Sequence, residues 1–184
     1  MADHRFPFAT LETARLRLRP LRPADAPDVH AVWNEREYLR FAPAGFPLAG
    51  AGLEKARTWC ATPAPASFAV TPLAAERLCG HVMLFGTDWD TMICEIHYWT
   101  APWGRGNGYA TEAARAAAEW ALRTVGFARV TLHAVVDNHA SRRVAEAAGF
   151  RFEGLLRNAA LTRAGRTDLA SYSLIPADLD GGPA

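Results

Sequence analysis

Apolar and polar positions near the N-terminus predict one strand followed by one helix. Leu16 to Arg19 alternate apolar and basic side chains at a period of two, which predicts a half-buried strand that stops at Pro20. Pro23 and Asp25 suit the first turn of a helix. The positions that then recur at roughly helical spacing are Ala26, Val29, His30, Trp33 and Glu37. We expect a helix over these residues, with Trp33 facing the core.

The next part of the chain predicts irregular structure, a short helix and then strands. Phe41 to Gly52 is rich in Gly and Pro and is expected to be irregular, whereas Leu53 to Cys60 favours a short helix. The stretches around Phe68–Val70 and from Leu78 to Phe85 predict a hairpin. Ile93 to Thr100 is rich in β-branched and aromatic residues and predicts a further strand. Three antiparallel strands are the expected result.

The second half of the chain alternates between helical and strand patterns. Many alanines and the lack of an internal breaker predict a helix from Tyr109 to about Thr124, which Gly126 closes. The later elements are strands at Val130–Val136, Phe150–Leu156 and Leu169–Ile175, and a short helix at Asn138–Ala148. Because neither a long linker nor a repeat interrupts this order, we expect an α/β fold in a single domain over residues 1–184.

The composition is that of an ordinary soluble domain, with 50% hydrophobic and 21% charged residues. The formal net charge of +1 provides no broad attraction to nucleic acid or to an anionic membrane, so we expect neither as a partner. No apolar run approaches the roughly 20 residues that span a bilayer, and no signal-type stretch follows Met1. A cytoplasmic location is therefore expected.

The cysteines do not suggest a metal centre. Cys60, Cys79 and Cys94 are odd in number and form no C-x-x-C pair, which argues against a disulfide framework and against a zinc site. We expect three buried thiols and no bound metal.

A glycine-rich segment between a predicted strand and a predicted helix is the main chemical signal. Gly104, Gly106 and Gly108 let the backbone approach a ligand closely, and the helix that follows presents free N–H groups and a positive dipole end. Arg105 can add a charged contact to a phosphate oxygen. The loop thus predicts a diphosphate site, although the glycines can equally serve only a sharp turn. The sequence has neither the Gly-Lys-Ser/Thr ending of a P-loop nor a full G-x-G-x-x-G between parallel strands.

The same loop carries a resemblance to a known family. The motif Arg105-x-x-Gly108-x-Ala110, preceded by Tyr98-Trp99 and followed by Thr111 to Ala113, resembles the acyl-CoA loop of the GNAT N-acetyltransferases. Downstream motifs resemble the RimJ/RimL-type branch, which modifies protein N-terminal amines; they are Val136-Asp137-Asn138-His139-Ala140-Ser141 and Ala148-Gly149-Phe150. The resemblance is dense over residues 95–154 and implies an acyl-CoA-dependent N-acetyltransferase with acetyl-CoA as co-substrate.

The resemblance also implies an architecture and a cofactor site. It implies a central mixed, mostly antiparallel sheet whose two central strands, Ile93–Thr100 and Arg129–Val136, splay apart, with helices on both faces. Backbone N–H groups would hold the CoA pyrophosphate; they belong to Arg105, Gly106, Asn107, Gly108, Tyr109 and Ala110. The backbone of Tyr98, Trp99 and Thr100 would pair with the pantetheine arm. Asn138 would contact that arm or cap the following helix.

For catalysis, the resemblance implies direct attack of a neutral amine on the acyl carbonyl, through a tetrahedral oxyanion, with two groups that handle protons. Ser141 matches the family's serine and would protonate the CoA thiolate, although a serine in the first turn of a helix can instead cap backbone N–H groups. Many relatives use a tyrosine for this step, and that position is Ala145 here.

Glu95 is the candidate general base, acting directly or through a water, and alternation places His97 on the same face of its strand. The structural alternatives are that Glu95 pairs with an arginine and that His97 is a hydrogen-bonded, half-buried ring. Glu112, in the first turn after the loop, is expected to favour the helix dipole rather than to take part in chemistry.

The amine acceptor stays open at this stage. The resemblance implies that Trp33 to Phe46 and the turn Arg163 to Arg166 line the acceptor side, where core packing is the favoured interpretation of the aromatic residues. The basic surface around Arg157, Arg163 and Arg166 can attract an acidic partner or form a solvated edge. The acceptor is expected to be a protein or peptide N-terminus; the alternatives are a small-molecule amine such as an antibiotic or polyamine, succinyl transfer, a non-catalytic CoA-binding regulator, or a plain interaction domain. Related proteins often pair as homodimers through sheet edges.

Overall fold

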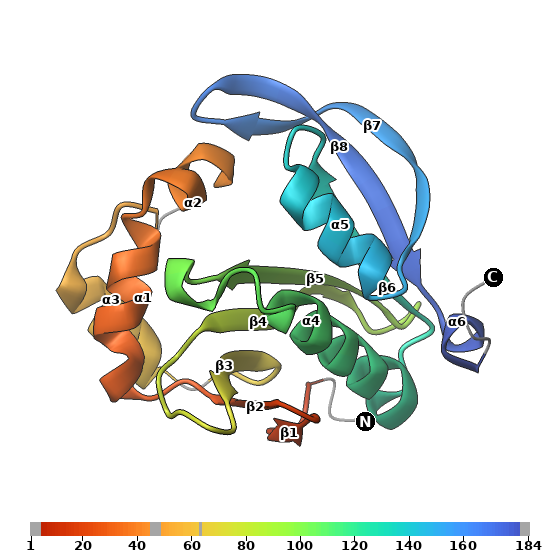
Figure 1. The fold of residues 1–184 in the computed structure, drawn as a ribbon. Helices are drawn as coiled ribbons and strands as arrows, with labels where there is room; N and C mark the ends of the chain where they lie inside the picture. The colour runs from red at the N-terminus through yellow and green to blue at the C-terminus, as the bar shows by residue number, and fades with distance from the viewer. Residues whose placement is uncertain (1–4, 45–48, 63, 181–184) are drawn as a thin grey trace.

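The computed structural model describes residues 5–44, 49–62 and 64–180 of the 184-residue chain. Its strands form an eight-stranded sheet in the order β1-β2-β3-β4-β5-β6-β8-β7 (Figure 1). The strands are β1 (Leu11–Glu12), β2 (Leu16–Pro20), β3 (Ser67–Pro72), β4 (Gly80–Asp88), β5 (Ile93–Thr100), β6 (Arg129–Val135), β7 (Arg151–Thr162) and β8 (Gly165–Leu174). The helical elements are η1 (Pro23–Asp25), α1 (Ala26–Trp33), α2 (Arg36–Phe41), α3 (Leu53–Ala61), η2 (Pro102–Gly104), α4 (Tyr109–Glu119), η3 (Trp120–Val125), α5 (His139–Ala147) and α6 (Pro176–Asp180).

The sheet is mixed and mostly antiparallel, as the family resemblance implied. Strands β1 to β5 pair antiparallel in chain order, and β6 and β7 each pair antiparallel with β8. The exception is β5 with β6, which run parallel. The predicted hairpin and the strand Ile93–Thr100 are therefore confirmed. Among the described helices, none is long and apolar enough to cross a membrane.

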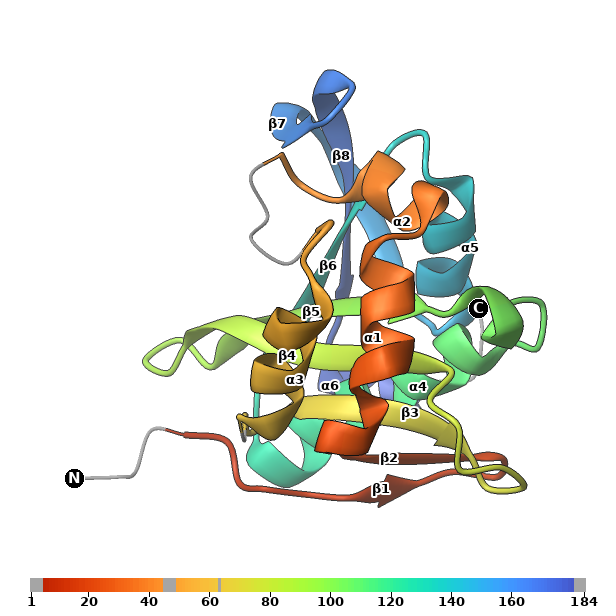
Figure 2. The same cartoon turned by 90° about the vertical axis from the view of Figure 1, so that its left-hand side faces the viewer.

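Helices cover both faces of the sheet, and each face has its own core (Figures 1 and 2). On one face, α4 and α5 pack through small buried residues, of which Ala117 and Ala145 are fully inaccessible to solvent. On the other face, α1 and α3 pack on β3 and β5, and Trp33 lies in that core as expected. Alternation along β5 thus sends successive side chains toward different helices.

The alternating strand β2 anchors the first helix. Its apolar residues Leu16 and Leu18 enter the core under α4, while Arg19 lies on the opposite face. There the Arg19 guanidinium donates two hydrogen bonds of 2.8 Å to the Asp25 carboxylate at the start of α1. Both side chains are buried, so the pair fixes where α1 begins.

The single helix predicted up to Glu37 is wrong, because the chain breaks it at Asn34. The Asn34 side chain donates to the carbonyl oxygens of His30 and Ala51, and Glu35 is extended. The Glu35 carboxylate then accepts the Tyr38 N–H at 2.9 Å and starts a second helix, α2, which includes Phe41. Local capping therefore redirects the chain toward the end of β5. Of the segment predicted to be irregular, residues 45–48, including Phe46, lie outside the described residues.

The second half follows the predicted alternation, with longer strands than expected. The helix α4 continues as the π-helical segment η3 up to Gly126, whose φ of 94° ends it. Strands β7 and β8 extend beyond the predicted bounds because they form one long hairpin, paired up to Thr162 and Gly165. All three cysteines are free and buried, as predicted.

Candidate active site

The two central strands separate after a short paired stretch, which confirms the predicted splay. Strands β5 and β6 pair only at Ile93–Arg129, Cys94–Val130 and Glu95–Thr131. Beyond Glu95, the edge of β5 that faces β6 has no strand partner among the described residues. The backbone of Tyr98, Trp99 and Thr100 lies on this unpaired edge, so its polar groups are free to bind an extended ligand.

The loop between β5 and α4 has the backbone geometry of an anion site. Gly106 and Gly108 have φ of 77° and 74°, in the left-handed region that residues with a Cβ atom rarely adopt. Within the described chain, the N–H groups of Gly106, Asn107 and Gly108 donate no hydrogen bond to another backbone group. Helix α4 follows directly, so Tyr109 and Ala110 add N–H groups of its first turn. The loop therefore has the backbone geometry that a diphosphate site requires, and its use as such a site stays a prediction.

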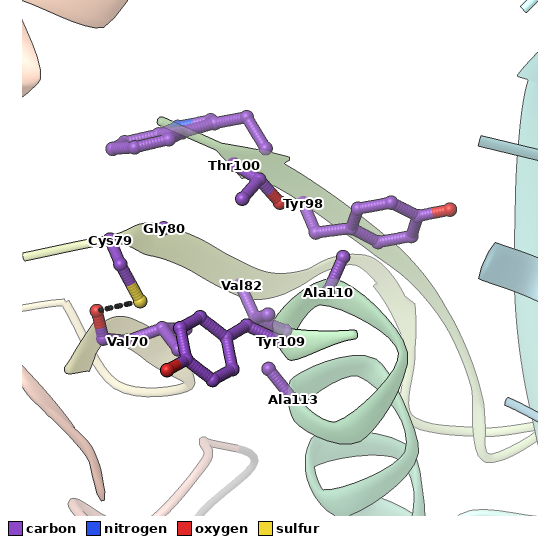
Figure 3. Close-up of a pocket in the computed structure, with 10 residues that line it drawn as sticks. Val70, Cys79, Gly80, Val82, Tyr98, Thr100, Tyr109, Ala110 and Ala113 are labelled. Carbon is purple, nitrogen blue, oxygen red and sulfur yellow. Dashed lines mark hydrogen bonds between the residues drawn. The ribbon is translucent and has the colours of Figure 1, made fainter. Parts of the chain in front are cut away.

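Gly104 has a different role from the other loop glycines. A Cβ at this position would lie 2.7 Å from the carbonyl oxygen of Cys79 and 2.9 Å from the Cys79 Cβ. Gly104 therefore allows η2 to pack closely against Cys79, the residue that precedes β4. This packing leaves a cavity of only ≈ 10 Å³ between the strands and α4, lined among others by Val82 and Tyr109 (Figure 3). Such a volume suits at most a water molecule.

The side chains of the loop point in several directions. The Arg105 guanidinium donates to the Glu35 carboxylate at 2.8 Å, so in this structure it contacts α2. The Asn107 amide donates to the carbonyl oxygens of Gly104 and Arg105 and braces the turn. Nearby, Arg15 donates to the Asn107 carbonyl oxygen at 2.9 Å. The loop is thus tied to two neighbouring elements by arginine side chains.

The Glu112 carboxylate helps to hold the loop in place, a structural role that is consistent with the expectation that it takes no part in catalysis. Its carboxylate accepts hydrogen bonds from Thr13 and Arg15, the latter at 2.7 Å. Burial raises the pKa of Glu112, but the hydrogen bonds from Thr13 and Arg15 outweigh it and leave the pKa below the usual value. The Arg15 guanidinium also lies over the Tyr109 ring, 5.4 Å from its centroid. Arg15 escaped the sequence analysis because nothing local links residue 15 to residue 107.

Ser141 lies in the first turn of α5 and contacts a tyrosine across the gap. Its Oγ is 2.9 Å from the Tyr98 hydroxyl, which also donates to the Ser141 carbonyl oxygen at 3.0 Å. The cap of α5 is Asn138, whose Oδ1 accepts the Ser141 N–H at 3.1 Å. The Ser141 hydroxyl is therefore not used as a cap. At Ala145, the position at which the resemblance implied a tyrosine in many relatives, the fully buried methyl group packs into the core.

The side chain of Tyr98 was missed by the sequence analysis, which considered only its backbone. It lies on the α4 and α5 face of β5, and Figure 3 shows its hydroxyl directed away from Tyr109. Burial raises the pKa of Tyr98 to about 12, so the hydroxyl keeps its proton at neutral pH. The alternation of Cys94, Ile96 and Tyr98 on one face was the available signal.

Glu95 lies on the opposite face, at the point where the strands separate. Its Oε1 is 3.2 Å from Nδ1 of His133 on β6, so its partner is a histidine and not the arginine considered above. The hydrogen bond that His133 donates to the Glu95 carboxylate raises the pKa of His133 above its usual value, and partial burial opposes this. His97, on the same face as Glu95, is half-buried, and its burial lowers its pKa.

A groove brings together parts of the two segments for which the resemblance implied a role in acceptor binding. Its walls are α2 and the β7–β8 turn, and its volume is ≈ 870 Å³. The residues that line it are Asn34, Glu35, Arg36, Glu37, Leu39, Arg40, Arg163 and Ala164. Trp33 is excluded, because it is buried in the core, where its ring packs on Trp59 with centroids 5.2 Å apart. Core packing is thus confirmed for this aromatic residue.

Comparisons with known proteins agree with this geometry. Residues 15–151 match the family model described as acetyltransferase (GNAT) domain. A curated protein of Bacillus subtilis (strain 168), named provisionally as the ribosomal N-acetyltransferase YdaF, is 35% identical over 104 residues. That alignment covers 56% of this chain and 57% of the relative, so the match spans little more than half of each.

Solved structures share the fold. An acetyltransferase (GNAT family) from Bacillus anthracis has a TM-score of 0.80 at 21% identity, covering 91% of this chain and 98% of its own. Mycobacterium smegmatis RimJ, solved in complex with CoA-disulfide, has a TM-score of 0.77 at 20% identity, covering 91% and 85%. The names of these relatives support the resemblance to the RimJ/RimL-type branch. Because the acetyltransferase (GNAT) family model matches most of this chain, the chain belongs to the GNAT acetyltransferase family.

Proposed function

We propose that this protein transfers an acetyl group from acetyl-CoA to a primary amine at the N-terminus of a protein or peptide. One observation carries the proposal: proton-handling groups lie on both faces of the gap between β5 and β6. Ser141 and Tyr98 meet on the α4 and α5 face, and Glu95 and His133 meet on the other. A thioester held in the gap would thus be reached by an acid from one side and by a base from the other.

The donor would be held mainly by main-chain atoms. The N–H groups from Gly106 to Ala110 suit the CoA pyrophosphate at the positive end of α4, whereas the Arg105 N–H already donates to the Pro102 carbonyl oxygen at 3.4 Å. The free edge at Tyr98 to Thr100 suits the amide-bearing pantetheine arm. Asn138, which caps α5, would orient the turn that carries Ser141. Bound acetyl-CoA supplies a thioester, whose C–S bond breaks as the acceptor nitrogen forms its bond to the acetyl carbon.

Glu95 is the proposed general base. Its carboxylate would take a proton from the acceptor ammonium, directly or through a water, so that a neutral amine attacks. His133 donates to the same carboxylate and would hold it in place. His133 is therefore a positioning residue in this proposal.

Ser141 is the proposed acid, supported by Tyr98. In the structure the single proton of the Tyr98 hydroxyl is donated to the Ser141 carbonyl oxygen. If this hydroxyl turns to donate to Ser141 Oγ, 2.9 Å away, the serine's own proton becomes free for the departing thiolate. Because burial keeps Tyr98 protonated, this donor is available at neutral pH. We propose that Tyr98, reaching across from β5, replaces the tyrosine that relatives carry at the position of Ala145.

The test is acetyl transfer from acetyl-CoA to peptides with free N-termini, followed by mass spectrometry and thiol release. In the Glu95→Gln variant, kcat should fall by about 10²- to 10⁴-fold, the range for loss of a general base. Acetyl-CoA binding, measured by calorimetry, should not change in this variant. His97→Asn is the matched control on the same strand face and should retain most activity. In Ser141→Ala, a fall of about tenfold or more is expected.

The outcomes separate the candidate roles. Loss of activity in His97→Asn together with full activity in Glu95→Gln would transfer the role of base to His97. Acetylation of small-molecule amines with no acetylation of any peptide would contradict the proposed acceptor while keeping the enzyme. Binding of acetyl-CoA without turnover on any amine would favour a non-catalytic regulator.

A further inference from the structure

The groove between α2 and the β7–β8 turn is built from two segments that are far apart in the sequence. Two backbone contacts hold its walls together beside the groove. The Ala44 N–H donates to the Leu161 carbonyl oxygen at 2.6 Å, and Pro43 forms an isolated antiparallel β-bridge with Thr162. The volume of ≈ 870 Å³ lies within the range of about 300–1,000 Å³ that is typical of ligand sites. The groove thus has room for more than the amine-bearing residue of an acceptor.

Three arginines line this groove without a carboxylate partner. Arg36 and Arg40 belong to α2, and Arg163 belongs to the turn opposite. Among the described residues, none of their guanidinium groups lies within 4.0 Å of a carboxylate oxygen. All three are exposed, so their charges face the solvent that fills the groove.

The two carboxylates of the groove are directed elsewhere. Glu35 accepts a hydrogen bond from Arg105 at 2.8 Å, and Glu37 lies 4.0 Å from the same guanidinium. Burial opposes ionisation of Glu35, but hydrogen bonds from Arg105 and from backbone N–H groups lower its pKa, so it stays charged and paired. The groove therefore has an excess of positive charge that its own acidic residues do not neutralise.

From this arrangement we infer that the acceptor carries carboxylate side chains in the residues that follow its N-terminus. The inference rests on the proposed function and names the class of peptide that the same site takes. Guanidinium groups from both walls would bind these carboxylates, in part as two parallel hydrogen bonds, and would fix the register of the peptide. The N-terminal amine would then extend toward Glu95, past the end of β5.

The test uses two peptides with the same N-terminal residue. One has Asp and Glu at the next several positions, and the other has Asn and Gln there. We expect kcat/KM to be about ten times higher for the acidic peptide at low salt, because two or three exposed charge pairs, each worth about two- to threefold, act together. This preference should shrink as the ionic strength rises, since salt screens exposed charges.

Variants then locate the preference in the groove. Arg163→Gln and Arg36→Gln should each reduce the ratio of acidic to neutral kcat/KM by about two- to fivefold, and the double variant should reduce it further. Arg157→Gln is the matched control, because Arg157 is an exposed arginine of the same hairpin that does not line the groove. It should leave the ratio unchanged.

The possible results are distinct. Equal kcat/KM for the two peptides, or a ratio that Arg157→Gln lowers as much as Arg163→Gln, would overturn the inference while the proposed function stands. No acetylation of either peptide, with acetyl-CoA still bound, would instead contradict the proposed function. Since the ratio is measured within each variant, a general loss of folded protein does not alter it.

Discussion

The loop at the start of α4 and the groove beside α2 are neighbours, but the ligand-binding roles proposed for them rely on different chemical groups. The loop offers backbone N–H groups from consecutive residues, in a conformation set by Gly106 and Gly108. The groove offers side chains from two remote segments, including Arg36 and Arg163. Arg105 joins the two regions through a close ion pair with Glu35 and a longer one, of 4.0 Å, with Glu37.

This difference distinguishes binding of the donor, which related proteins can share, from binding of the acceptor, which can differ between them. Main-chain binding depends on local geometry, so any sequence that keeps the left-handed glycines and the helix start can bind the same diphosphate. Side-chain binding changes with each substitution in either wall, so it can differ between related proteins. We therefore expect donor use to be tolerant of most substitutions and acceptor choice to be sensitive to few.

The largest expected effect comes from blocking the loop itself. In Gly108→Trp, a bulky side chain would start from a backbone with φ of 74° and from a Cβ 3.4 Å from the Arg15 guanidinium. Both the strain and the bulk would displace the N–H groups, so calorimetry should find acetyl-CoA affinity reduced by about 100-fold or more, the loss of several charge-assisted hydrogen bonds.

Gly126→Trp is the control for backbone strain. Gly126 also has a left-handed φ, 94°, but it ends the helix far from the loop and a Cβ there meets nothing within 4 Å. This variant should lose stability and keep its affinity for acetyl-CoA. Equal loss of affinity in both variants would mean that the loop glycines are only structural.

The loop and the second half of the fold could be predicted because their signals are local. The run of alanines before Gly126, the glycines of the loop and the strand Ile93–Thr100 each lie within one short stretch of sequence. Such patterns reflect the conformation of the same residues that carry them. The strand splay followed from the family resemblance and not from periodicity.

The rest of the site could not be predicted, because it depends on contacts between distant residues. Glu95 meets His133, and Tyr98 meets Ser141, only because β5 lies beside β6 and α5. The break at Asn34 is a similar case, since its amide is held in part by the Ala51 carbonyl oxygen, which no helical pattern in residues 23–37 reveals. In each case a tertiary contact determined the outcome.

A smaller effect is expected at His133, on β6 beside the gap between the two central strands. In His133→Ala, the Glu95 carboxylate would lose its donor, and kcat should fall by about tenfold, the value of one hydrogen bond to a charged group. His133→Asn keeps a donor near the position of Nδ1 and should recover most of this loss. An equal loss in both variants would argue for a merely structural role.

The pH dependence of stability provides an independent test of this pair. Because the folded protein raises the pKa of His133, the protonated ring stabilises the fold fully below the unfolded pKa of about 6.5, and this stabilisation is lost as pH rises through the folded value. The difference in unfolding free energy between the wild type and His133→Asn should thus be larger at pH 6 than at pH 8.5. With the ring partly exposed, the change should stay below about 1 kcal/mol. Denaturant titrations at the two pH values measure it.

The smallest expected effect sharpens the link between the two regions. In Glu35→Gln, the amide oxygen can still accept the Tyr38 N–H and cap α2, but Arg105 loses its carboxylate partner. The freed guanidinium would then contact a phosphate oxygen without competition, so the Kd for acetyl-CoA should fall by about two- to threefold, the value of a partly exposed ion pair. Calorimetry at two salt concentrations measures the change.

Glu37→Gln is the control for this variant. Because Glu37 lies at the longer distance of 4.0 Å from the Arg105 guanidinium, its substitution should change the Kd less. Weaker binding in Glu35→Gln would mean instead that the ion pair holds the loop in its binding conformation, and the two regions would then be coupled and not in competition.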